Sequence, residues 1–103
     1  MKEAQEQVAR LMEEHRLMSD PKERFLDLSS ELGELAKELL KAGGYGEKKP
    51  EITPGLTEEL GDCVFSLLAL CRSLGVNAEE AFEQTMEKYR QRLALTGRAD
   101  SGR

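Results

Sequence analysis

Four acidic residues in two short motifs are the part of this sequence best suited to chemistry. Glu31 and Glu34 are spaced i, i+3, and so are Glu59 and Asp62. On a helix, that spacing places both carboxylates of a pair on one face. Acids gathered on two packed helices repel one another and resist the loss of water, so they need protons or a cation between them. Because oxygen-only ligands favour hard ions, the pattern predicts a site for Mg²⁺ or Mn²⁺.

Helix start and stop signals divide the chain into four elements that must position these acids. The predicted helices cover about 2–17, 21–41, a stretch from between 53 and 57 to 74, and 78–96. Asp20 before Pro21 and Asn77 before two glutamates are N-cap signals. Gly43 and Gly75 are the corresponding stops. The acidic pairs therefore fall on the second and third helices, which we expect to pack together.

Length and composition fit one small helical domain. The chain has 103 residues, no Trp and 5% aromatic residues, which favours helices over a β-sandwich. We expect an all-α domain over residues 1–96, followed by a disordered tail at 97–103. A net charge of -5 disfavours binding to nucleic acid polymers. No signal peptide or membrane span is expected, and Cys63 and Cys71 in an apolar setting indicate reduced thiols in the cytoplasm.

The third predicted helix carries information about assembly. Between Leu60 and Leu74 it is apolar around most of its circumference, and a helix of that kind is normally buried on nearly all sides. Three other helices from one short chain do not easily cover it. We therefore predict a helical-bundle homo-oligomer, either a homodimer or a homotetramer, with this helix near its centre.

The two acidic motifs resemble a known family. LSSELGEL at 28–35 followed by EELGDC at 58–63 is similar to the signature of the MazG-like, all-α nucleotide pyrophosphohydrolases, which is E-E-x-x-E, a spacer and E-x-x-D. The Gly75-Val76-Asn77 break and the run Glu87-Lys88-Tyr89-Arg90 also look like the family. The resemblance covers about residues 25–92 and implies a four-helix MazG-like subunit.

The resemblance implies a reaction and a set of metal ligands. Members hydrolyse nucleoside triphosphates between the α and β phosphates, with Mg²⁺, to a monophosphate and pyrophosphate, a reaction suited to nucleotide-pool cleaning. Carried over to this chain, the metal ligands are Glu31, Glu34, Glu59 and Asp62. Mn²⁺ is a possible substitute for Mg²⁺. The nucleobase and the sugar stay open at this point.

Three further residues are candidates for the reaction. Ser30 stands where the family's first motif usually opens with Glu, so we consider Glu38, one turn past Glu34, as a substitute catalytic base. Lys88 and Arg92 share one face of the last predicted helix at i, i+4. They are the candidate phosphate-binding residues, because pyrophosphate leaves with high negative charge.

Several alternatives remain open. The glycine-rich loop at 43–55 lacks the P-loop pattern, and it is either a plain connector or a lid that brings Lys48 or Lys49 over the triphosphate. The chain is alternatively a phosphoribosyl-ATP pyrophosphohydrolase, or a non-catalytic helical module for interaction or regulation. A di-iron bundle is disfavoured, because it usually needs E-x-x-H pairs and His15 is the one histidine.

Overall fold

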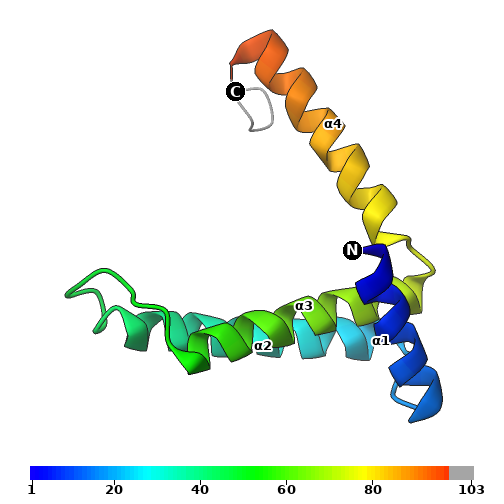
Figure 1. Cartoon of the computed structure of the whole chain (residues 1–103), viewed down its shortest axis with the longest axis horizontal. Coiled ribbons are helices and arrows are strands. Elements are labelled where there is room, and N and C mark those ends of the chain that lie inside the picture. The colour runs from blue at the N-terminus through cyan, green and yellow to red at the C-terminus, as the bar shows by residue number, and fades with distance from the viewer. Residues whose placement is uncertain (98–103) are drawn as a thin grey trace.

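The computed structural model describes residues 1–97 and consists of four α-helices, with no strand among those residues (Figure 1). The helices are α1 (Lys2–Glu14), α2 (Pro21–Ala42), α3 (Pro54–Leu74) and α4 (Ala78–Thr96). The predicted all-α class is confirmed. The predicted disordered tail at 97–103 lies outside the described residues except for Gly97, which caps α4 in the left-handed conformation with φ 71°.

Side-chain caps begin three of the helices, at the predicted positions Asp20 and Asn77 and at Thr53, where the sequence left the helix start open between 53 and 57. The Asp20 carboxylate accepts a hydrogen bond from the Lys22 backbone N–H at 2.8 Å, directly before Pro21. The Thr53 hydroxyl accepts from the Leu56 N–H at 3.1 Å, and the Asn77 side chain accepts from the Glu80 N–H at 3.1 Å. Each of these bonds satisfies an N–H that the helix leaves unpaired in its first turn, which fixes where the helix begins.

The first helix is shorter than predicted. It ends at Glu14, because Arg16 takes a positive φ of 50° that breaks the helical path. His15, which the periodicity places in the apolar stripe, is exposed at the end of the helix. The expectation of a helix to about residue 17 was therefore wrong by about one turn.

Two long helices, α2 and α3, form the centre of the molecule and lie side by side (Figure 1). They run antiparallel, since Asp27 near the start of α2 accepts a hydrogen bond from Ser66 in the second half of α3. The first helix crosses α3, and its contact forms the core. The core residues are Val8, Met12, Leu68, Ala69 and Ala78, with Phe65 and Cys71 packed against them.

The fourth helix contacts α1 near its beginning and then runs away from the α2–α3 pair (Figure 1). Gln5 of α1 holds this junction with both ends of its side-chain amide. Its Nε2 donates to the Val76 carbonyl at 2.8 Å, and its Oε1 accepts from the Ala78 N–H at 2.8 Å. Ala78 is the first residue of α4, so Gln5 fixes the point from which that helix departs.

One chain leaves part of the third helix uncovered. Within one chain, its side chains toward α1 and α2 are buried, but a row of apolar residues is about half exposed: Leu60 48%, Val64 55%, Leu67 48% and Leu74 56%. Phe82 and Leu93 of α4 are exposed to the same degree. No helix in the described part of the chain is long and apolar enough to cross a membrane.

Candidate metal centre

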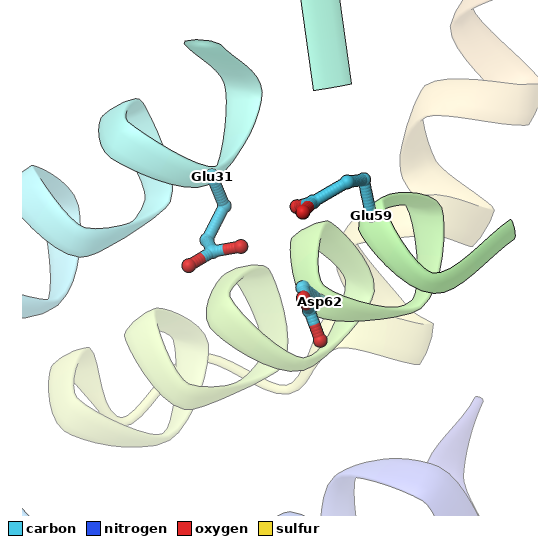
Figure 2. Close-up of side chains that lie close together, drawn as sticks. All are labelled: Glu31, Glu59 and Asp62. Carbon is cyan, nitrogen blue, oxygen red and sulfur yellow. The ribbon is translucent and has the colours of Figure 1, made fainter. Parts of the chain in front are cut away.

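Three of the four predicted ligands meet between the two central helices (Figure 2). Glu31 projects from α2, and Glu59 and Asp62 project from successive turns of α3. One carboxylate oxygen from each residue lies within 4.8 Å of the other two. The i, i+3 spacing on α3 and the antiparallel packing of α2 produce this cluster, which we call the three-carboxylate group.

Glu59 is the member of the group whose carboxylate is partly cut off from water. Its Oε2 atom is buried and has no hydrogen-bond partner. Loss of water raises the pKa of Glu59 above its ordinary value, and the nearby charges of Asp62 and Glu31 raise it further. Ionised Glu59 keeps this buried oxygen without a partner beside two other acids, so the setting favours either a proton or a cation.

The group also affects a cysteine beneath it. Cys63 is buried one turn after Glu59 on α3. Burial raises the pKa of the Cys63 thiol, and the charges of Glu31, Glu59 and Asp62 add to that effect. The thiol therefore stays protonated at neutral pH and is an apolar neighbour of the group rather than a nucleophile.

The chemistry of the donor set fits a hard divalent cation. All three donors are carboxylate oxygens, the ligand type that Mg²⁺ and Mn²⁺ prefer. Mg²⁺ holds its ligands at about 2.1 Å, which places ligand oxygens roughly 3 to 4 Å apart. The carboxylate oxygens of the group, which lie within 4.8 Å of one another, are close to that spacing. The unpartnered Glu59 Oε2 is the atom that gains most from a cation.

Glu34, the fourth predicted ligand, is not part of the three-carboxylate group among the described residues. It is exposed on α2, one turn from Glu31. Its charge still contributes to the raised pKa of Glu59, so it lies within electrostatic reach of the group. The structure places Glu34 at the solvent side of the site.

Glu38, the predicted substitute base, also lies outside the three-carboxylate group. Its Oε1 pairs with Lys41 Nζ at 3.4 Å. Its Oε2 lies against the first turn of α3, where a Cβ atom on Gly55 would come within 2.8 Å of it. The glycine at this position gives Glu38 room, and the carboxylate sits at the helix end that favours negative charge.

The two predicted phosphate-binding residues lie on α4, which runs away from the three-carboxylate group (Figure 1). They flank one aromatic ring: Lys88 Nζ lies 5.1 Å, and the Arg92 guanidinium carbon 6.0 Å, from the centre of the Tyr89 ring. Such contacts position cations over the face of the ring. One chain by itself does not bring these cations to the acids.

Two residues near the site are not found by sequence analysis. Asp27, one turn before Glu31, accepts a hydrogen bond from the Ser66 hydroxyl at 3.0 Å and so ties α2 to α3. Arg24, one turn earlier, is buried, and its Nε and Nη1 atoms have no hydrogen-bond partner. Asp27 lies four residues before Glu31, so helical spacing would have placed both on the same face of α2. The burial of Arg24 has no signal in the sequence, because arginine is usually exposed.

The fold and the site together define an all-α protein that gathers carboxylates between two paired helices. Comparison with known proteins identifies the family: the model of the MazG nucleotide pyrophosphohydrolase domain matches residues 19–94, and the chain belongs to that family. The matched region includes α2, α3 and most of α4. The family is described as a nucleotide pyrophosphohydrolase domain, and its members are typically metal-dependent.

One curated relative is similar to part of the chain. It is the uncharacterized protein YpjD of Bacillus subtilis (strain 168), 41% identical over 68 residues, which are 63% of this chain and 60% of that protein. The chain thus spans less than two thirds of the length of this relative. No solved structure matches the chain.

Proposed function

We propose that this protein is a Mg²⁺-dependent nucleoside triphosphate pyrophosphohydrolase that releases a monophosphate and pyrophosphate, in the service of nucleotide-pool cleaning. The observation that carries the proposal is the three-carboxylate group with its unpartnered Glu59 oxygen, in a chain of the MazG family. The ion pairs among the described residues all involve other acids, so none of them neutralises the three-carboxylate group. A bound ion is the simplest way to hold these three charges together.

The residues of the chain have distinct roles in this proposal. Glu31, Glu59 and Asp62 hold the ion, and Glu34 joins them from the solvent side by a rotation of its side chain. When bound, Mg²⁺ supplies positive charge against the triphosphate and makes a nearby water more acidic. Glu38 is the proposed base that takes a proton from the attacking water, and its test is Glu38→Gln, which keeps the size of the side chain but cannot take up that proton.

We further propose that Lys88 and Arg92 act on a triphosphate held by another copy in a homodimer or homotetramer. The support is the course of α4, which leads both cations away from the acids of their own chain. Mixing two inactive variants tests this. If the sites are shared, Asp62→Asn and Lys88→Gln together regain activity after joint refolding, because some sites contain no altered residue. Absence of any recovery would contradict it.

Product analysis tests the reaction itself. The purified protein is incubated with canonical and modified NTPs and dNTPs and with phosphoribosyl-ATP, in Mg²⁺, Mn²⁺ or EDTA, and the products are separated by chromatography. We expect metal-dependent formation of a monophosphate and pyrophosphate, with the ranking of substrates separating pool cleaning from the biosynthetic alternative. Release of orthophosphate and a diphosphate would contradict the proposed bond cleavage. No turnover of any substrate would favour a non-catalytic module.

A further inference from the structure

The hydrogen bond between Ser66 and Asp27 joins the two central helices inside the molecule. The Ser66 hydroxyl on α3 donates to Oδ2 of Asp27 on α2 at 3.0 Å. Ser66 is 2% exposed, so water has little access to the hydroxyl, and this bond is the one that satisfies it. Outside the three-carboxylate group, no other hydrogen bond or ion pair between side chains links α2 with α3 in the part of the chain that the structure describes.

The bond lies one helical turn from the three-carboxylate group on both helices. On α2, Asp27 comes four residues before Glu31, and on α3, Ser66 comes four residues after Asp62. Residues four apart share one face of a helix and lie about 6 Å apart along its axis. Because the helices are antiparallel, the bonded pair and the carboxylate group are successive levels of one seam between α2 and α3.

The distance between α2 and α3 at this level determines the spacing of the ligand oxygens. Glu31 approaches from one helix, and Glu59 and Asp62 approach from the other (Figure 2). Their like charges repel one another, which drives the helices apart at this level. The bond between Ser66 and Asp27 opposes that separation, because O–H···O bonds keep their oxygens within about 3.0 Å and a distance of about 3.6 Å breaks them.

We propose that Asp27 and Ser66 are a positioning pair that holds α2 and α3 at the separation a small divalent ion requires, so that the group prefers Mg²⁺ to Ca²⁺. The inference rests on the metal site of the proposed function and adds to it the residues that set its ion preference. Mg²⁺ takes oxygens at about 2.0 to 2.1 Å in a nearly rigid octahedron, whereas Ca²⁺ takes them at about 2.3 to 2.6 Å with flexible geometry. A difference of about 0.3 Å per ligand is of the size that the length limit of one hydrogen bond enforces.

The role belongs to the bond rather than to the charge of Asp27. Asp27 is not a member of the three-carboxylate group, and Ser66 occupies its Oδ2. Asn offers the same kind of oxygen acceptor without the charge, so Asp27→Asn keeps the bond. Ser66→Ala and Asp27→Ala break it from opposite sides. Ser73→Ala is the matched control, because the Ser73 hydroxyl donates to the Leu70 carbonyl of its own helix at 2.7 Å.

Competition between cations tests the pair in the full-length chain. Mn²⁺ binding is followed from the free-ion signal in electron paramagnetic resonance, and Mg²⁺ and Ca²⁺ are titrated separately as competitors. We expect the wild type to bind Mg²⁺ more tightly than Ca²⁺. Ser66→Ala and Asp27→Ala should weaken Mg²⁺ binding by about tenfold or more and Ca²⁺ binding by less than about threefold. Asp27→Asn and Ser73→Ala should keep the ratio of the two affinities within about twofold of the wild type.

The ratio of affinities separates positioning from a merely structural role, which would lower stability and leave the ion preference unchanged. Circular dichroism checks that each variant is folded. The proposal is overturned if Ser66→Ala and Asp27→Ala keep the wild-type ratio, if Asp27→Asn or Ser73→Ala loses it to the same extent, or if the wild type prefers Ca²⁺.

The same measurements distinguish this proposal from the proposed function. The predicted ratios without any turnover of nucleotides would contradict only the proposed hydrolysis. Metal-dependent turnover with an ion preference that Ser66→Ala leaves unchanged would contradict only the role of this pair. No saturable binding of any cation by the wild type would overturn both.

Discussion

Replacing Gln5 with Ala tests how the direction of α4 is set. The substitution removes both hydrogen bonds of the side-chain amide, to the Val76 carbonyl and from the Ala78 N–H. A hydrogen bond contributes about 1 kcal/mol net, and leaving a buried partner unsatisfied costs roughly 1 to 3 kcal/mol. Ala78 is buried, whereas the bond to Val76 is exposed. We therefore expect a loss of about 2 kcal/mol in the free energy of unfolding, most of it from Ala78.

The structure also predicts what a conservative variant does. Gln5→Glu keeps an oxygen that accepts from the Ala78 N–H and places a negative charge at the start of α4, where charge of that sign is favourable. It loses the exposed bond to the Val76 carbonyl, and the second carboxylate oxygen turns toward solvent because both atoms are acceptors. We expect Gln5→Glu to lie within about 0.5 kcal/mol of the wild type. The matched control is Gln7→Ala, at an exposed position of the same helix.

The assay is urea unfolding followed by circular dichroism at one fixed protein concentration, because an oligomer's stability depends on concentration. A loss of about 2 kcal/mol lowers the melting temperature of a domain this size by roughly 8 to 16 °C. The reasoning is refuted if Gln5→Ala and Gln7→Ala unfold alike. It is also refuted if Gln5→Glu destabilises the protein as much as Gln5→Ala, since the Ala78 bond would then not be the important one.

Three further predictions concern charge, packing and thiol reactivity. Because the pKa of Glu59 is raised in the folded state, its contribution to the stability of the metal-free protein should be fully present below the ordinary carboxylate pKa and lost as pH rises through the raised value. Glu59→Gln should remove that contribution, so the difference in melting temperature between wild type and variant in EDTA should change over this pH range. Leu68 is 4% exposed in the core, so Leu68→Ala should lower the free energy of unfolding by about 2 to 5 kcal/mol. Leu95 is 86% exposed, so Leu95→Ala should change it by less than about 0.5 kcal/mol, and equal effects in chemical unfolding would contradict the packing. Cys63 should react with a maleimide far more slowly than a free thiol at neutral pH, because burial and the neighbouring acids raise its pKa, and fast labelling without unfolding would contradict its placement.

The local structure follows closely from the sequence. Asp20 and Asn77 cap their helices as predicted, and Thr53 fixes the start of α3 that the sequence left open, because each side chain satisfies an N–H only a few residues away. The end of α1 escapes prediction, since the positive φ of Arg16 arises where the chain turns to let α2 reach α3. His15 is exposed for the same reason.

The site is predictable in part. The i, i+3 spacing of Glu59 and Asp62 fixes their common face, and antiparallel packing brings Glu31 to them. The same spacing does not place Glu34, because the rotation of α2 about its own axis decides which residue of the pair faces α3. That rotation depends on how the whole apolar face packs, which is a property of the tertiary structure. The positions of Lys88 and Arg92 relative to the acids depend in turn on the direction of α4.

The most direct test of the central claim is Mn²⁺ binding, measured from the free-ion signal in electron paramagnetic resonance, with Mg²⁺ as competitor. The account predicts saturable binding to the wild type that Mg²⁺ displaces and that Asp62→Asn weakens by at least about tenfold. Glu58→Gln, at an exposed neighbour outside the three-carboxylate group, should bind like the wild type. Equal binding by Asp62→Asn and Glu58→Gln, or no saturable binding by the wild type, would contradict a metal centre at Glu31, Glu59 and Asp62.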